Sequence, residues 1–293
     1  MKPRLKKIPV KLESSYNIKH DVMPNFGNVW HYHPELELHY NIRGEGLRFI
    51  GDNIDNFSSG EIILLGQNLP HAWRCREEYF QQDPDLNIEA IVLQFLPDYM
   101  GKEWINIPEA YMIPKLYETA KSGMLFYGET KQQVAKLMHE AARAEGLERV
   151  ILLLSILKIL SESDEYKLIT SQYHAFNSPN EADTIRLNRV YTHTFSNYKS
   201  EIKLQEIAAI SNLSVTSFCR YFKMMTRKSY YDFLIEIRVS HACRMLIENL
   251  LPTEVICFEC GFNNVSNFYR HFKKQKGVTP LEYKRIHLRD KRK

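Results

Sequence analysis

The sequence predicts an α+β protein of two domains, with an antiparallel β-rich N-terminal half and an all-helical C-terminal half. A length of 293 residues exceeds one ordinary compact core. Short apolar or alternating runs, separated by turn-forming residues, fill positions 1 to 110 and are typical of an antiparallel sheet or barrel. Helical periodicity then takes over. We therefore predict an N-terminal domain over 1–163, a linker over 164–183 and a C-terminal domain over 184–293.

Two periodicities predict the elements of the N-terminal domain. The expected strands are Leu36–Ile42, Leu47–Ile50, Ile62–Leu65 and Ile88–Phe95. From 111 to 163 the spacing is helical, with one apolar face formed by Val134, Leu137, Met138 and Ala141 and a strongly apolar helix over Leu147–Leu160. We expect these helices to pack on the sheet or on a second subunit.

Composition and charge indicate a globular, unexported protein with one basic half. Hydrophobic residues make up 44% of the chain and charged residues 25%. The N-terminus lacks a signal-peptide core and no apolar run spans a bilayer, so we expect a cytoplasmic protein that does not enter a membrane. The five cysteines, an odd number, are expected to be reduced thiols.

The charge is unevenly distributed along the chain. Residues 184–293 hold 20 Lys/Arg and 9 Asp/Glu, net +11, whereas the remainder holds 19 and 26, net −7. This asymmetry favours a polyanionic partner for the C-terminal half alone. A solvated basic face without a partner is the alternative.

The C-terminal half contains an internal repeat of about 50 residues. The first copy has Ile207-Ala208, Asn212-Leu213-Ser214 and Phe218-x-Arg220-x-Phe222-Lys223, and the second has Ile256-Cys257, Gly261-Phe262-Asn263-Asn264 and Phe268-x-Arg270-x-Phe272-Lys273. A small residue, Ala208 or Cys257, lets a first helix approach its partner closely. A residue that tolerates unusual backbone angles, Asn212 or Gly261, then ends that helix. The spacing predicts two helix-turn-helix units.

The second helix of each unit has distinct inner and outer faces. Ser214 or Asn264 can cap its N-terminus, and the phenylalanines four residues apart pack inward. Arg220 and Arg270 lie between those phenylalanines and project from another face. Two arginines in equivalent positions within a basic segment favour contact with a DNA groove over simple solvation.

A long helix is expected between the two copies, over Tyr230 to Leu251. Its apolar positions are Phe233, Leu234, Ile237, Ala242, Leu246 and Leu250. A rigid connector of this kind fixes the separation of two recognition helices, as insertion into successive major grooves about 34 Å apart requires. A purely structural core helix is compatible with that role.

These residues resemble the DNA-binding domain of the AraC/XylS family of bacterial regulators. The resemblance covers about 184 to 293, and the second copy matches the family signature through Gly261-Phe262, Ser266-Asn267-Phe268-Tyr269-Arg270-His271-Phe272-Lys273-Lys274, Gly277-Val278-Thr279-Pro280 and Tyr283. It implies binding to double-stranded DNA, a homodimer, control by a small-molecule effector such as a sugar or related metabolite and, for an activator, contact with RNA polymerase.

The family's use of the recognition helices implies specific DNA contacts here. The positions that match base-reading residues are Thr216, Ser217, Cys219, Arg220, Ser266, Asn267 and Arg270, and those that match phosphate-contacting positions are Ser214, Lys223, Asn264 and Lys273. Arg227 stands where the family often has Gly, so the first recognition helix is expected to end differently. Cys257-x-x-Cys260 lacks a second ligand pair, and we expect no zinc there.

The N-terminal domain contains a dense set of metal-ligand residue types. His31-x-His33-x-x-x-Glu37 is followed after six residues by Gly44, and His71 closes a stretch that begins at Gly60. On one strand, residues 31, 33 and 37 would share a face because side chains alternate. With His71 from a neighbouring strand they form a three-nitrogen, one-oxygen set that suits a divalent transition metal.

This spacing resembles the two motifs of the cupin β-barrel over roughly residues 27–75, although Gly66 and Asn68 stand where the second motif expects proline and glycine. The resemblance implies a barrel that holds either a divalent metal or, without metal, a small-molecule effector. For an effector pocket, the candidate lining residues are Trp30, Tyr32, His39, Tyr40, Arg43 and Trp73.

Three functions fit this sequence. The first, which we favour, is a ligand-responsive, non-enzymatic transcription regulator in which the barrel binds an effector and the 111–163 helices dimerise. The second is an effector-independent DNA binder whose barrel is only a dimerisation platform. The third is a metal-dependent cupin enzyme with a DNA-binding tail, for which the sequence offers no general acid or base beyond the ligands.

Overall fold

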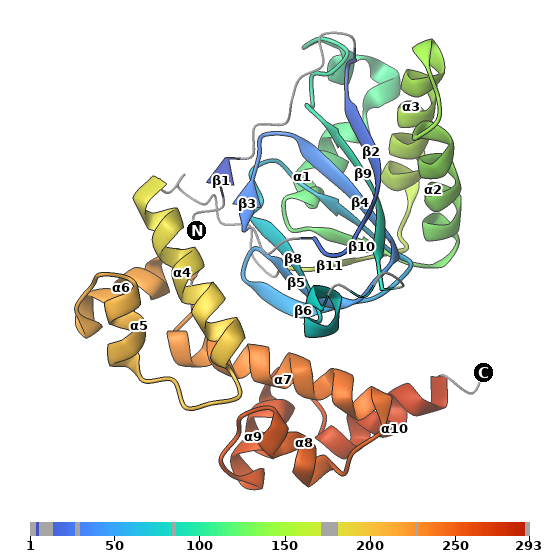
Figure 1. Ribbon diagram of the computed structural model, residues 1–293. Helices are drawn as coiled ribbons and strands as arrows, with labels where there is room; N and C mark the ends of the chain where they lie inside the picture. The colour runs from blue at the N-terminus through green and yellow to red at the C-terminus, as the bar shows by residue number, and fades with distance from the viewer. Residues whose placement is uncertain are drawn as a thin grey trace. The chain divides into compact units, whose positions relative to one another are not determined.

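A computed structural model describes residues 4–5, 14–26, 30–81, 83, 86–170, 181–226 and 228–290. The chain forms two compact units, one drawn mainly from residues 3–179 and the other mainly from 180–293. The first consists of antiparallel sheets with helices, and the second is entirely helical in its described residues (Figure 1). The predicted fold class is therefore confirmed.

The strands of the N-terminal unit form two sheets. The described strands are β1 (Arg4–Leu5), β2 (Asn17–Met23), β3 (His31–Tyr32), β4 (Leu36–Arg43), β5 (Gly46–Ile50), β6 (Asn53–Phe57), β7 (Glu61–Leu65), β8 (His71–Cys75), β9 (Ile88–Phe95), β10 (Met124–Phe126) and β11 (Tyr166–Leu168). One sheet has the order β1-β3-β8-β5-β6 and the other β11-β10-β7-β4-β9-β2. β1 and β3 run parallel, whereas the neighbours in the second sheet pair antiparallel.

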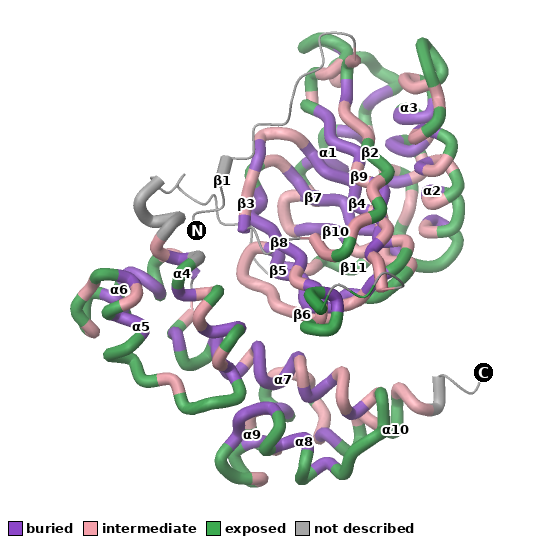
Figure 2. The backbone as a smooth tube through the Cα atoms, viewed as in Figure 1, coloured by how far each residue is buried: buried purple, intermediate pink, exposed green. Residues whose placement is uncertain are grey.

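Three helices cover the outer face of the six-stranded sheet (Figures 1 and 2). They are α1 (Ile113–Ala120), α2 (Gly128–Ala141) and α3 (Gly146–Glu162), and short 3-10 turns occur at Glu77–Phe80, Trp104–Asn106 and Pro108–Ala110. Leu36 and Leu38 of β4 belong to the same buried cluster as Val134 of α2 and Leu153 of α3. No helix within the described ranges combines the length and apolar character needed to cross a bilayer.

Alternation along β4 sends the intervening side chains to the other face, between the two sheets. A second apolar cluster there joins Ile50 and Trp73 from one sheet to Ile63 and Leu65 from the other. Glu37 lies level with Leu65 in the strand register and is itself buried. The sheet pairing thus places a carboxylate in the interior, beside this apolar cluster.

The strands and helices expected from the sequence are present, with two differences at the end of this unit. Met124–Phe126, inside the region expected to be helical, forms β10 against β7. Tyr166–Leu168, inside the expected linker, forms β11 against β10. Three-residue strands are too short to show a period of two, so the sequence pattern missed both. Residues 171–180 of the expected linker lie outside the described residues.

Seven helices are described in the C-terminal unit. They are α4 (Glu181–Asn197), α5 (Leu204–Ile210), α6 (Val215–Thr226), α7 (Tyr230–Glu248), α8 (Thr253–Glu259), α9 (Val265–Lys276) and α10 (Pro280–Asp290). The start of α7 contacts α6, since the Phe233 and Phe222 rings lie 5.3 Å apart. Further along α7, Ala242 and Leu246 share a buried cluster with α8 and α9. One helix therefore supports both helix-turn-helix units.

The connecting helix is shorter than the sequence suggested. It ends at Glu248, and Asn249 takes a left-handed conformation with φ 57° that stops it. Leu250, which we assigned to its apolar face, is instead 81% exposed. The assignment was wrong because it followed the apolar spacing past Asn249. Asparagine tolerates left-handed backbone angles and can therefore end a helix.

Gly261 offers a test of the turn geometry in the second unit. Its φ is +82°, and an added Cβ would lie 2.5 Å from the carbonyl oxygen of Tyr198, whereas Gly277, at φ +75°, has open space around it. We expect Gly261→Ala to lower the free energy of unfolding by about 1–3 kcal/mol more than Gly277→Ala, because both strain the backbone but only the former also clashes. Urea unfolding of the full chain, followed by helical circular dichroism, measures both; equal losses would contradict the predicted clash.

Candidate functional site

The turns of the two helix-turn-helix units have the same hydrogen bonds. The amide of Leu213 donates to the carbonyl oxygen of Ala208 at 2.9 Å, and the amide of Phe262 donates to that of Cys257 at 3.1 Å. The intervening Asn212 and Gly261 have φ of 54° and 82°. These are the bonds of a helix C-terminus closed by a left-handed residue, which confirms the turn predicted from the repeat.

Each recognition helix is capped at its N-terminus by the predicted residue. Asn264 accepts a hydrogen bond from the backbone amide of Asn267 at 2.7 Å, and Ser214 accepts one from that of Ser217 at 3.3 Å. The caps fix where α6 and α9 begin. The free amides and positive dipole end of each helix therefore point outward beside the exposed polar residues of its first turn.

Paired phenylalanines hold each recognition helix against the rest of the unit. Phe218 and Phe222 of α6, and Phe268 and Phe272 of α9, are completely buried. Their ring centroids lie 5.5 Å apart in α6 and 5.6 Å apart in α9. Because two residues one turn apart are buried on each helix, the opposite face is left for solvent or a partner.

All the residues predicted to contact DNA lie on these exposed faces. They are Ser214, Thr216, Ser217, Cys219, Arg220 and Lys223 on or beside α6, and Asn264, Ser266, Asn267, Arg270 and Lys273 on or beside α9. On α9, Arg270 donates through Nη2 to Oδ1 of Asn267 at 3.0 Å, which orients the guanidinium along the helix. Lys274, also exposed on α9, adds to the positive surface although the motif comparison did not select it. The expected effect of Arg227 on the end of α6 lies outside the described residues.

The Cys257 and Cys260 thiols belong to the apolar core of the second unit rather than to a surface site. Both are almost fully buried, and Cys260 donates to the sulfur of Met245 at 3.7 Å. Burial raises the pKa of Cys260 to about 12, so this thiol stays protonated at neutral pH. A protonated thiol is a poor metal ligand.

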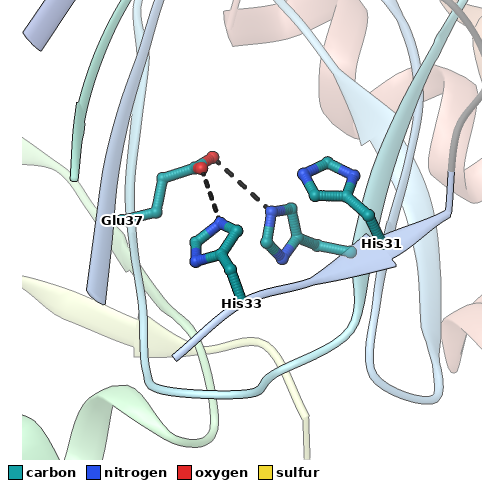
Figure 3. Close-up of side chains that lie close together, drawn as sticks. His31, His33 and Glu37 are labelled. Carbon is teal, nitrogen blue, oxygen red and sulfur yellow. Dashed lines mark hydrogen bonds and ion pairs between the residues drawn. The ribbon is translucent and has the colours of Figure 1, made fainter. Parts of the chain in front are cut away.

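A second candidate site lies between the sheets of the N-terminal unit. His31, His33, Glu37 and His71 each offer a ligand atom, and these atoms lie within 4.8 Å of one another. Figure 3 shows His33 directed at the Glu37 carboxylate, with His31 on the same side. The four predicted metal-ligating residues are therefore brought together.

These four residues converge from two sheets, whereas we expected residues 31, 33 and 37 to lie on one strand. His31 and Glu37 do not share a face of one strand: β3 ends at Tyr32, and Glu37 lies on β4 of the other sheet. His31 instead pairs in register with His71 of β8, and their ring centroids are 4.3 Å apart. The chain changes sheets between His33 and Glu37, which the period-two argument did not anticipate.

Hydrogen bonds fix the histidine rings. Nδ1 of His71 donates to the carbonyl oxygen of Leu69 at 2.8 Å, and Nδ1 of His33 donates to that of Glu35 at 3.1 Å. Nε2 of each ring then faces Glu37, at 3.0 Å for His33 and 3.7 Å for His71. Nε2 of His71 is buried without a hydrogen-bond partner. When deprotonated at Nε2, His33 and His71 would direct lone pairs toward a cation placed between them and the carboxylate.

Burial and the neighbouring histidines set the charge of this site. Burial by itself would raise the pKa of Glu37, but His71, His33 and His39 together hold that pKa well below its usual range. Burial lowers the pKa of His71, against the opposing effect of Glu37. The Glu37 carboxylate is therefore ionised, which is the form of this side chain that binds a metal ion.

Sequence reasoning missed Gln94, which completes this site. Its Nε2 donates to Oε2 of Glu37 at 2.6 Å, and Gln94 is buried. It lies on β9, level with Glu37 in the strand register. Period-two alternation on β9 places Gln94 on the inner face, but a lone glutamine in an apolar strand gave no motif to detect.

The residues predicted to line an effector pocket are dispersed. His39 stacks on Trp73 with ring centroids 4.0 Å apart, and its Nδ1 lies 3.6 Å from Oε1 of Glu37. Tyr40 faces the helices instead, 5.7 Å from the ring of His139. Arg43 is largely exposed beside Glu89. Of the two remaining residues, Trp30 is buried and Tyr32 partly buried.

Comparison with known proteins agrees with the helix-turn-helix geometry. Residues 207–286 match the family model HTH_18, described as a helix-turn-helix domain. The chain is 30% identical over 100 residues to the uncharacterized HTH-type transcriptional regulator YdeC of Bacillus subtilis, covering 34% of this chain and 33% of that relative. It therefore spans about a third of the length of YdeC.

A longer similarity extends through both units. The chain is 22% identical over 263 residues to the HTH-type transcriptional activator RhaR of Escherichia coli O139:H28, covering 87% of this chain and 86% of RhaR. Among solved structures, ToxT from Vibrio cholerae aligns over 92% of this chain and 98% of its own, with 14% identity and a TM-score of 0.35. These matches agree with the resemblance of the C-terminal unit to the AraC/XylS regulators: residues 207–286 match a helix-turn-helix domain, and both units are similar in sequence to an HTH-type transcriptional activator.

Proposed function

We propose that this chain regulates transcription by binding double-stranded DNA through α6 and α9. The main support for the proposal is a geometry that occurs twice. Each of the two helices is held by a buried phenylalanine pair and exposes a polar first turn and an arginine. Both arginines lie in a segment of net charge +11. A positively charged surface with two such helices fits a polyanionic duplex.

The residues on each recognition helix divide into two roles. The arginines and the polar side chains of the first turn are long or flexible enough to reach base edges in a major groove. Lys223 and Lys273 lie near the other end of their helices, where their charge suits phosphates. Arg270 is oriented by Asn267, so less side-chain freedom is lost when its guanidinium binds a base.

The connecting helix supports simultaneous insertion of both helices. α7 has 19 residues, and at 1.5 Å per residue it is roughly 28 Å long. That length is close to the spacing of about 34 Å between successive major grooves on one face of DNA. Since α6 packs near the start of α7 and α9 further along it, the helix holds the two modules apart.

Arginine substitutions test this proposal. At genomic sites recovered with the full chain, we expect Arg220→Ala and Arg270→Ala each to weaken binding by about 1–3 kcal/mol, roughly 5- to 150-fold, because each removes a groove contact. Fluorescence anisotropy at fixed salt measures the affinities. Arg143→Ala, which removes an exposed arginine of the N-terminal unit, is the matched control and should bind as the wild type does. Unchanged affinity in both recognition-helix variants would refute the proposal.

The proposed function also includes control of DNA binding by a small-molecule effector. His39 supports it, because its Nε2 is buried without a hydrogen-bond partner in the N-terminal unit, whereas its Nδ1 faces Glu37 at 3.6 Å. A buried polar group without a partner is costly unless a ligand satisfies it. The homodimer, and contact with RNA polymerase by an activator, accompany this proposal as predictions.

A metabolite panel distinguishes effector control from effector-independent binding. We expect one compound class, with sugars included in the panel, to change the affinity of the full chain for DNA by about 5- to 150-fold, the usual range of allosteric coupling. His39→Leu should reduce that response without changing DNA affinity in the absence of ligand. If no compound alters binding, the N-terminal unit is better explained as a dimerisation platform.

A divalent transition-metal centre is a second candidate function, carried by the convergence of His31, His33, Glu37 and His71. Nitrogen and oxygen atoms bound to one ion at about 2.1 Å lie about 3 to 4 Å apart. The distances from Glu37 to His33 and His71, 3.0 and 3.7 Å, fall in that range. The residues thus fit such an ion, which would neutralise Glu37 and link the two sheets.

Metal analysis tests this centre directly. We expect the purified chain to contain about one equivalent of a divalent transition metal by mass spectrometry, and His33→Ala to contain none, because one nitrogen ligand is lost. His20→Ala is the matched control, since His20 also contacts a glutamate, Glu89, at 2.9 Å but outside the cluster. A wild-type chain that stays metal-free after reconstitution with zinc, manganese and iron would rule the centre out.

A further inference from the structure

Glu37 is held by a row of inward-facing polar side chains that crosses three neighbouring strands. Asn17 of β2 lies level with Gln94 of β9, and Gln94 lies level with Glu37 of β4. The strand register therefore aligns the three side chains on the inner face of the sheet. Their sequence separations are large, and only the sheet brings them together.

The hydrogen bonds along this row have a defined direction. Nδ2 of Asn17 donates to Oε1 of Gln94 at 3.1 Å. Because an ionised carboxylate only accepts, the Gln94 amide nitrogen faces Glu37 and donates to Oε2 at 2.6 Å, which leaves the Gln94 oxygen to accept from Asn17. The hydrogen bond from Asn17 thereby supports the orientation of the Gln94 amide that suits a carboxylate.

The contact fixes Glu37 without neutralising it. Oε2 accepts from Gln94 and lies 3.0 Å from Nε2 of His33, whereas Oε1 lies 3.6 Å from His39 and 3.7 Å from His71, beyond hydrogen-bonding distance. A neutral amide leaves the full negative charge on the carboxylate, which a lysine or arginine in its place would cancel. The carboxylate plane is thus set while its charge remains available to a cation.

We propose that Gln94, oriented by Asn17, is a positioning residue that holds the Glu37 carboxylate for a divalent metal ion. This inference rests on the metal centre proposed above. Groups that hydrogen-bond to a metal ligand typically contribute 10- to 100-fold to metal affinity, because they remove the freedom of the ligand to turn away. Gln94 would act on the ion only through Glu37.

A matched pair of glutamine substitutions tests the proposal. Gln94→Leu removes the amide donor at similar volume. Gln133→Leu makes the same change on the exposed surface of α2, where Gln133 donates to Oε1 of Glu129 at 3.0 Å. Titration of the full metal-free chain with Co²⁺, followed by its visible absorption, reports both the affinity and the coordination of the ion.

We expect Gln94→Leu to bind Co²⁺ about 10- to 100-fold more weakly than the wild type with an altered spectrum, and Gln133→Leu to match the wild type. Asn17→Ala, which leaves Gln94 in place, should lose less Co²⁺ affinity than Gln94→Leu. If Gln94→Leu fails to fold, the Asn17→Ala result tests the positioning role instead. Wild-type affinity and spectrum in both the Gln94 and Asn17 variants would overturn the positioning role while leaving the metal centre intact. Failure of the wild type itself to bind Co²⁺ would overturn the centre, and this inference with it.

Discussion

The geometry of the C-terminal unit depends on two buried pairs of phenylalanines. In each module the rings occupy adjacent turns of the recognition helix and are completely buried, so neither helix can rotate about its axis without exposing large apolar surface. The turn that precedes each helix, with its left-handed residue, fixes the angle of entry. Because the buried rings fix the rotation of each helix, its polar residues stay on the exposed face. A fixed polar face is suitable for reading a groove.

The C-terminal unit could be predicted from the sequence almost completely, because its determinants are local. A small residue, a turn residue, a cap and two phenylalanines lie within 15 positions in the first copy, from Ala208 to Phe222, and within 16 in the second, from Cys257 to Phe272. The second copy has the same residue types in the same order, which favours a helix-turn-helix unit over other interpretations of each copy alone. The error at Leu250 arose at the end of α7, where one left-handed asparagine stops the helix and the apolar period alone could not show it.

The N-terminal site depends on contacts between residues far apart in sequence, and there the prediction was only partly sufficient. The ligand types at His31, His33, Glu37 and His71 were recognisable from their spacing, but the distribution of these residues over two sheets was not. For the same reason, the sequence did not reveal that Gln94 contacts Glu37 or that Tyr40 faces the helices. Which face of a strand lies inside is decided by the helices that cover the other face, and those helices are encoded more than 70 residues after β4 begins.

The two caps use their side chains differently. Asn264 accepts the amide of Asn267 through Oδ1, and its amide nitrogen can donate to a further acceptor. Ser214 has a single hydroxyl proton, which it already donates to the hydroxyl of Ser217 at 2.9 Å while accepting the Ser217 amide. A phosphate, which only accepts, can meet the Asn264 amide directly, whereas at the first cap the hydroxyl proton left to donate is that of Ser217. The repeat is thus symmetric in its backbone and unequal in the donors that its caps leave exposed: an amide in the second module and a neighbouring hydroxyl in the first.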